Sequence, residues 1–235
     1  MTLDFPAWMG PRLRSFLAEL HERPADQYDT ATMFSGPEGS GKSTLACHIL
    51  KALDPTFDVD RIAYSTSEFI EIGKRLKPGQ ARLLDESDEG AFSGDVHSRD
   101  SKDFAKHLFR CRELRLHNAL VLPNVRWMAS VVKEHRANHW FLCPQRGEAI
   151  VHRMRRADYQ GAKTAWDKLF GLNFGPYDPE WWETRYRPNK VRRLLELEQP
   201  GREEPEAVAS AWPPLDPAVV KAWAARLEPT LLRGA

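Results

Sequence analysis

The sequence contains few cysteines and no long apolar segment. Its three cysteines, Cys47, Cys111 and Cys143, lie far apart, without the close pairs that zinc sites use. We therefore expect buried thiols in a reducing compartment rather than a disulfide framework. No apolar run is long enough to cross a bilayer, and the N-terminus has no basic segment followed by an apolar one. These absences predict a cytoplasmic protein without stable membrane insertion.

The chain also lacks an excess of charge of either sign. Its 34 Lys and Arg residues nearly balance 33 Asp and Glu residues, so the net charge is +1 and the molecule as a whole is not a polycation. Charge is concentrated locally instead, with acids at 85–89 and bases at 185–193. We find no internal repeat. A length of 235 residues with 42% hydrophobic residues is enough for one sizeable core and a small appendage.

Apolar spacing predicts helices and strands that alternate along most of the chain. The helical stretches are 11–22, 42–53, 67–77, 100–114 and 125–135, and the strand-like stretches are 28–36, 61–67, 81–87, 117–124, 139–143 and 149–154. This alternation predicts an α/β fold with a mostly parallel sheet covered on both faces. We expect an N-terminal helix within 1–27, a core over 28–172, and a Pro- and Trp-rich extension over 173–235 that ends in a helix.

A glycine-rich loop lies between the first predicted strand and the helix at 42–53. It fits the pattern G-x-x-x-x-G-K-[ST], and its residues are Gly36, Pro37, Glu38, Gly39, Ser40, Gly41, Lys42, Ser43 and Thr44. Small residues let backbone N–H groups converge on phosphate oxygens, and the following helix directs its positive end at the same anion. We therefore expect a nucleotide-binding loop, in which Lys42 reaches the β- and γ-phosphates and Ser43 holds Mg²⁺.

Two acids follow a short apolar strand. Asp85 and Glu86 come directly after Leu83 and Leu84. An acid at the end of a buried strand beside the phosphate loop can hold the Mg²⁺ shell, and we assign that role to Asp85. Glu86 would then face the attacking water as general base. An adjacent Asp-Glu pair favours hydrolysis over phosphoryl transfer to a small acceptor.

Further polar residues flank the strand at 117–124. Asn124 follows this strand, where a polar side chain would lie beside the γ-phosphate and sense it, although a simple turn after Pro123 would use asparagine equally well. Arginine fingers stabilise phosphoryl-transfer transition states and often come from a neighbouring subunit. Arg112 precedes the strand and Arg136 ends the next predicted helix, so both are candidates.

Together these features resemble the FtsK–HerA branch of the P-loop ATPases. The phosphate loop is followed by LLDE at 83–86, by FRCRELRLH at 109–117 and by ALVLPN at 119–124. The resemblance covers about residues 28–145 and implies a three-layer RecA-like (ASCE) P-loop NTPase fold, plus a small helical C-terminal extension. The family often ends its sensor strand in Thr-Gln, whereas this chain has Leu122, Pro123 and Asn124.

Within that branch, a single compact core resembles the genome-packaging ATPases of membrane-containing icosahedral viruses. It is also similar to the Zot-like assembly ATPases of filamentous phages, but those usually carry a transmembrane segment, so packaging is the better fit. The resemblance implies an ATP- and Mg²⁺-dependent motor that packages viral double-stranded DNA without reading its sequence. It also implies a homo-oligomeric ring that docks on a capsid or portal-vertex protein, in the host cytoplasm or on the virion.

Two other functions remain open on the sequence. An NTP-dependent assembly factor, or a helicase-loader-like switch, would bind nucleotide tightly and turn it over slowly. A small P-loop kinase would need an acceptor pocket, and the Asp85–Glu86 pair argues against it. Lys102, Lys106 and Arg110 share one helical stripe that could contact DNA phosphates, but a solvated face balanced by nearby acids would show the same pattern.

Overall fold

The protein is described from a computed structural model, which covers residues 5–85, 99–128, 132, 135–155 and 165–198. The chain forms two compact units, residues 1–174 and residues 175–235. The first unit holds the sheet and the helices around it, and each unit is described by itself. No helix among the residues covered is long and apolar enough to span a membrane.

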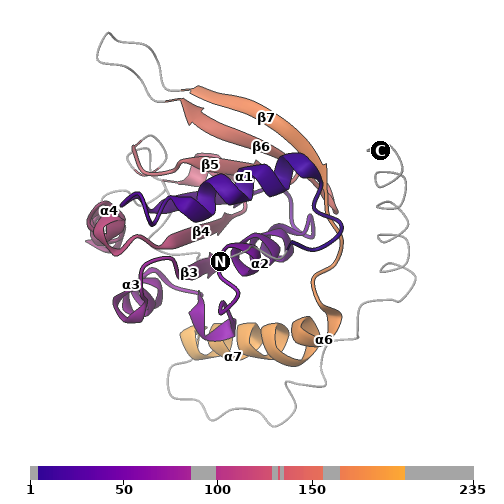
Figure 1. Cartoon of the computed structure of the whole chain (residues 1–235). Helices are drawn as coiled ribbons and strands as arrows, with labels where there is room; N and C mark the ends of the chain where they lie inside the picture. The colour runs from indigo at the N-terminus through magenta and orange to yellow at the C-terminus, as the bar shows by residue number, and fades with distance from the viewer. Residues whose placement is uncertain (1–4, 86–98, 129–131, 133–134, 156–164, 199–235) are drawn as a thin grey trace. The chain divides into compact units, whose positions relative to one another are not determined.

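A seven-stranded sheet forms the centre of the first unit (Figure 1). Its strands lie in the order β2-β3-β4-β1-β5-β6-β7. Their bounds are β1 Thr30–Ser35, β2 Ile62–Ala63, β3 Ala81–Asp85, β4 His117–Leu122, β5 His139–Leu142, β6 Glu148–Arg155 and β7 Ala165–Asn173. The pairs from β2 to β5 are parallel, and β6 and β7 add two antiparallel strands at one edge. The parallel strands are almost fully buried because helices cover both faces.

Helices form a layer on each side of the sheet (Figure 1). On one side α1, Pro11–Glu22, packs on α2, Lys42–Leu53, and α2 contacts β1, β3 and β4. On the other side α3, Thr66–Arg75, packs on α4, Arg99–Arg110. This three-layer arrangement with a mostly parallel sheet is the expected P-loop NTPase fold.

Alternation along the strands divides the core between the two faces. Phe34 of β1 stacks on Phe141 of β5 with ring centres 4.9 Å apart, and Phe16 of α1 contacts Phe141 edge-on. Their neighbours point the other way, so Met33 joins the cluster under α3 and α4 that includes Phe104. Period-two alternation in β1 therefore supplies both layers of the core from one strand.

Several predicted boundaries are confirmed and others differ. The helices at 11–22 and 42–53 match α1 and α2 residue for residue. The helix expected at 67–77 begins earlier, because the hydroxyl of Ser65 accepts from the Glu68 N–H at 3.2 Å and caps α3. The helix expected at 100–114 ends as an α-helix at Arg110 and continues as a 3-10 turn, Cys111–Leu114. The start of the helix expected at 125–135 is a 3-10 turn, Val125–Trp127.

The strand β7 is absent from the sequence-based expectations. It pairs antiparallel with β6 along its whole length and has an irregular register between Val151 and His152. Most of its side chains are exposed or half-buried, so its apolar signal is weak. A strand of this kind at a sheet edge is stabilised by its partner rather than by a buried face of its own.

The second unit contains one helical segment in its described part. Asp178 caps the N–H groups of Glu180 and Trp181, and Pro179 occupies the first turn of α6, Pro179–Trp181. A π-helical turn, Trp182–Tyr186, leads into α7, Arg187–Glu198. Trp182 stacks on Tyr186 with ring centres 3.9 Å apart. The terminal helix expected after residue 212 lies outside the described residues.

Candidate functional site

The glycine-rich loop connects the carboxyl end of β1 to the amino end of α2. Gly41 caps α2 with φ 89, a left-handed conformation that residues with a side chain rarely adopt. Its carbonyl accepts the first bond of the helix, from Leu45 N–H at 2.9 Å. The loop therefore places the N–H groups of the first turn of α2 at the carboxyl edge of the sheet, where an anion would meet them.

The start of the loop is held by two neighbouring strands. A Cβ atom on Gly36 would lie 2.0 Å from the carbonyl oxygen of Cys143, so only glycine fits there. Cys143 follows β5, and its N–H donates to the Ser35 carbonyl at 2.7 Å. On the other side, Pro123 follows β4 and accepts from the Gly36 N–H at 3.4 Å. The sequence did not single out Cys143 and Pro123 as loop contacts, because nothing in their spacing shows which strands flank β1.

Ser43 and Asp85 meet although 42 residues separate them. The Ser43 hydroxyl donates to the Asp85 carboxylate at 2.6 Å. Asp85 is the last residue of β3 and is fully buried, while Ser43 belongs to the first turn of α2. A buried carboxylate beside a hydroxyl is a pair of oxygen ligands of the kind that Mg²⁺ prefers. Among the described residues no cluster of three or more His, Cys, Asp or Glu side chains could hold a metal.

Side chains within the loop fit a bound nucleotide. Pro37, Glu38 and Gly39 are exposed at the tip, whereas Lys42 is 4% exposed. The Lys42 ammonium donates to the Pro37 carbonyl at 3.0 Å, so it lies across the loop that a phosphate would enter. The buried Ser40 hydroxyl has no hydrogen-bond partner among the described residues. A phosphate oxygen would supply an acceptor for both side chains.

The predicted sensor lies at the same edge of the sheet. Asn124 is exposed and follows β4, and β4 pairs with β1 so that Leu122 lies opposite Ser35. Its side-chain oxygen accepts from the Arg126 N–H at 2.9 Å and caps the 3-10 turn that follows. One end of the amide is therefore used locally, and only its NH₂ group could contact a phosphate. Glu86, the expected general base, lies outside the described residues.

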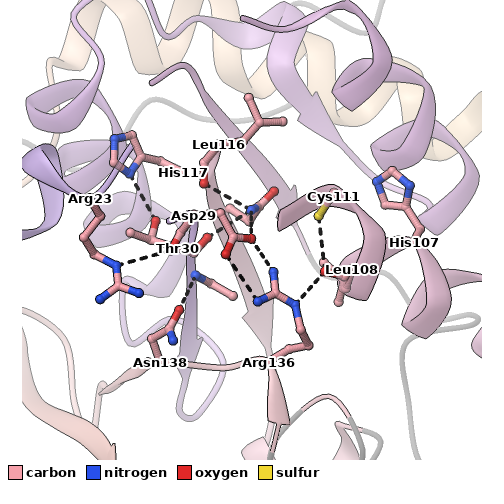
Figure 2. Close-up of polar contacts among 12 residues, drawn as sticks. Arg23, Asp29, Thr30, His107, Leu108, Cys111, Leu116, His117, Arg136 and Asn138 are labelled. Carbon is pink, nitrogen blue, oxygen red and sulfur yellow. Dashed lines mark hydrogen bonds and ion pairs between the residues drawn. The ribbon is translucent and has the colours of Figure 1, made fainter. Parts of the chain in front are cut away.

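The two candidate arginines lie at the opposite edge. Arg112 is exposed in the 3-10 turn before β4, at the amino end of that strand. Arg136 is 5% exposed and forms a buried ion pair with Asp29, which directly precedes β1, and its Nε donates to the Leu108 carbonyl at 2.5 Å (Figure 2). The geometry does not support Arg136 as an arginine finger, because both ends of its guanidinium are used inside the core.

The Asp29–Arg136 pair is part of a buried polar network (Figure 2). Asn118 of β4 donates to Asp29 at 3.4 Å and accepts from Arg82 Nε at 2.7 Å. Arg82 is fully buried, and burial lowers its pKa to about 10. It also contacts His107 at 3.1 Å, and burial together with this cation lowers the pKa of His107 to about 4. Two sequence signals could have indicated this network. They are Arg82, the one charged residue within the apolar part of ARLLD, and Asp29, the acid just before β1.

Similarity to known proteins is found at the level of structure and not of sequence. No protein-family model and no curated protein matches the sequence. Matching solved structures include the N-terminal domain of zonular occludens toxin from Neisseria meningitidis, at 10% identity and TM-score 0.41, covering 67% of this chain and 99% of that one. They also include the genome packaging NTPase B204 from Sulfolobus turreted icosahedral virus 2 with ATP-gammaS, at 12% identity and TM-score 0.41, covering 60% and 98%. Because both scores are low, the fold and the site rest on this chain's own strand order and loop geometry.

Proposed function

We propose that the chain is an ATP-hydrolysing motor that moves nucleic acid. The observation that carries the hydrolytic part is the Ser43–Asp85 contact of 2.6 Å at the head of the phosphate loop. In this proposal the loop N–H groups and Lys42 bind the β- and γ-phosphates of ATP. Ser43 and Asp85 hold Mg²⁺, which neutralises charge on the phosphates when bound.

The proposed hydrolysis needs a base and a sensor. Glu86 follows Asp85 directly in the sequence, so its carboxylate is the group we assign to accept the proton of the attacking water. Asn124 would donate its NH₂ group toward the γ-phosphate, since its oxygen is bonded to the Arg126 N–H. Arg112 would stabilise the transition-state charge from a neighbouring subunit.

The nucleic-acid part of the proposal is supported by one helix face. Lys102, Lys106 and Arg110 of α4 are all exposed, while Phe104 and Leu108 of the same helix are buried. Lys106 also pairs with Asp103 at 3.4 Å, but both side chains are more than half exposed, so this pair is weak and readily exchanged. An exposed cationic stripe of this kind suits phosphates and carries no base-reading group.

The finer proposal is that the nucleic acid is double-stranded DNA packaged into a viral capsid by a homo-oligomeric ring. Its support is the resemblance of the loop, the Asp-Glu pair and the strand at 119–124 to the FtsK–HerA branch. A capsid or portal-vertex protein would then anchor the ring, in the host cytoplasm or on the virion.

The test is phosphate release from ATP and Mg²⁺, with and without non-specific duplex DNA. We expect the wild-type chain to hydrolyse ATP, duplex to stimulate it severalfold, and Glu86→Gln to keep ATP bound but uncleaved. The triple change of Lys102, Lys106 and Arg110 to alanine should remove the stimulation and leave the DNA-free rate. Slow turnover that ignores DNA would instead favour the NTP-dependent assembly factor or switch.

A further inference from the structure

Two turns at the amino edge of the sheet hold an aromatic side chain between two arginines. The guanidinium carbon of Arg112 lies 5.1 Å from the centre of the Tyr28 ring, and that of Arg23 lies 5.5 Å from it. Both distances are within the cation–π range. Tyr28 is 47% exposed and Arg112 is exposed as well. We call Arg23, Tyr28 and Arg112 the arginine–tyrosine cluster.

The backbone on both sides of the cluster adopts an uncommon conformation. Within the described ranges, Gln27 with φ 64 and Arg115 with φ 54 are the non-glycine residues that have positive φ. Gln27 directly precedes Tyr28, and Arg115 comes three residues after Arg112. Residues with side chains adopt this region infrequently, and such positions gather at functional sites. Both of these positions therefore flank the same cluster.

Hydrogen bonds fix both turns and one of the arginines. Tyr28 N–H donates to the Arg23 carbonyl at 2.9 Å, and Arg115 N–H donates to the Arg112 carbonyl at 3.1 Å. The Arg23 Nε donates to the Asp29 carbonyl at 3.2 Å (Figure 2). The Tyr28 ring is therefore set against an anchored, half-buried arginine, while Tyr28 and Arg112 are both exposed.

The cluster lies far from the phosphate loop of its own chain. Arg112 precedes the amino end of β4, whereas the loop follows the carboxyl end of β1, and the two strands run parallel with Thr30 opposite His117. At about 3.3 Å per residue, the two ends of β1 are roughly 17 Å apart. Arg112 therefore lies too far from the phosphate loop of its own chain to contact a nucleotide bound there.

We propose that Tyr28 and Arg23 are positioning residues, which hold the Arg112 guanidinium toward the ATP phosphates of a second copy of this chain. This inference rests on the proposed ATPase function. The ring restricts the rotamers of a long side chain that would otherwise lose entropy on engaging a phosphate. Arg23 lies against the same ring and adds a second positive charge to the edge that the polyphosphate would meet.

The first test compares two substitutions of the ring. Tyr28→Leu removes the π-face, and we expect kcat for ATP to fall about three- to thirtyfold while KM for ATP stays within about twofold. Tyr28→Phe keeps the π-face and should retain the wild-type kcat, since the phenyl ring still packs against both guanidinium groups. Lys74→Ala, which removes an exposed cation on α3 paired with Glu71, is the matched control and should leave kcat unchanged.

The second test asks whether the cluster acts between copies. Lys42→Ala subunits have a disabled loop and an intact cluster, whereas Tyr28→Leu subunits have the reverse, so mixing them should restore part of the wild-type rate. The double variant Lys42→Ala/Tyr28→Leu mixed with Arg112→Ala should give no recovery. A Tyr28→Leu protein that is merely misfolded would not be rescued by mixing, so recovery distinguishes positioning from a structural role.

Three outcomes overturn the inference. They are an unchanged kcat for Tyr28→Leu, the absence of recovery on mixing, and a chain that remains monomeric while hydrolysing ATP. The failure of the proposed function has a different signature, because wild-type protein without any ATPase activity would overturn that proposal and this inference with it. Wild-type hydrolysis with an indifferent Tyr28→Leu variant would overturn the inference alone.

Discussion

The Ser43 hydroxyl donates to the Asp85 carboxylate across 2.6 Å, which joins the first turn of α2 to the last residue of β3. Asp85 is fully buried. A buried carboxylate is costly unless it has partners. A hydroxyl donor, a cation or both would therefore stabilise Asp85 at this edge of the sheet. The contact explains why a loop and a strand that are distant in the sequence can act as one site.

Replacing Asp85 should weaken the affinity of the protein for Mg²⁺ more than its affinity for nucleotide. We expect Asp85→Asn to raise the Mg²⁺ concentration for half-maximal ATPase activity by about tenfold or more, because a neutral amide is a poorer ligand for a hard cation. The measurement is a Mg²⁺ titration of phosphate release. An unchanged titration midpoint would show that Asp85 serves only to hold Ser43.

Replacing Lys42 should strongly weaken nucleotide binding while leaving the fold intact. The side chain is buried across the loop and donates to the Pro37 carbonyl at 3.0 Å. We expect Lys42→Ala to lower the affinity for a fluorescent ATP analogue by about two orders of magnitude, since a charge-assisted contact to the phosphates is lost. Lys51→Ala on the same helix, where the ammonium reaches the Phe57 carbonyl at 2.9 Å, should bind normally. Equal affinity of the two variants would contradict the loop assignment.

The Asp29–Arg136 pair should contribute to stability rather than to hydrolysis. Both side chains are buried, so Arg136→Met leaves an unpaired carboxylate and should lower the free energy of unfolding by about 3–5 kcal/mol. The double variant Asp29→Asn/Arg136→Met should lose less, because no buried charge remains unpaired. Urea unfolding of Arg136→Met and of the double variant measures the difference. A strong loss of kcat in Arg136→Met protein at unchanged stability would restore Arg136 as a finger candidate.

Gly73 of α3 should be irreplaceable for reasons of space. A Cβ atom there would lie 1.8 Å from Arg82 Nη1, and Arg82 cannot move aside because it is fully buried and bonded to Asn118 and to the Phe69 carbonyl. Gly73→Ala should destabilise the fold by about 1–3 kcal/mol. The control is Gly10→Ala, where nothing lies within 4 Å and where we expect a change within about 0.5 kcal/mol. Thermal unfolding of both variants measures the difference in stability between them.

Acid should destabilise the protein through two buried histidines. Burial, aided by Arg153, lowers the pKa of His139 to about 3, and burial with His21 nearby lowers that of His117 to about 4. Both side chains are neutral in the folded state, so the unfolded chain binds more protons below pH 6.5 and stability falls as the pH drops from there toward 4. Each group should contribute about 1.4 kcal/mol per pH unit within that range. His139→Phe should flatten urea-unfolding stability against pH, and an unchanged slope would contradict this account.

Local patterns predicted the parts of the fold whose signal lies within one element. The bounds of α2 could be predicted because the glycine loop ends where the helical repeat of apolar residues begins. Gly41 at the end of that loop caps the helix, so the helix begins at Lys42. The helix expected at 67–77 begins one residue earlier, at Thr66. Both Ser65 and Ser67 could cap it on sequence grounds, and only the bond from the Glu68 N–H to the Ser65 hydroxyl distinguishes them. The strand β7 was missed because its exposed side chains show little apolar alternation.

The sequence indicated which residues could form the candidate site, but not at which edge of the sheet each of them lies. Residue spacing assigned Ser43 and Asp85 to one proposed Mg²⁺ site, and the structure brings their side chains within 2.6 Å, because parallel strands place their carboxyl ends at the same edge of the sheet. The same spacing could not show that Arg136 turns inward to Asp29 while Arg112 stays at the surface. A charged side chain near a strand end is compatible with either, and its burial depends on what the other elements provide.

The sequence by itself determined the chemistry of the loop, because glycines at fixed spacing before a lysine and a serine are required for backbone groups to surround a phosphate. Only the tertiary structure decided which side chains share an edge. The order β3-β4-β1 brings Asp85 to Ser43, and two turns far apart in the sequence bring Arg112 against Tyr28. These contacts depend on strand order and on the turns at the strand ends, and no local pattern of residues encodes either of them.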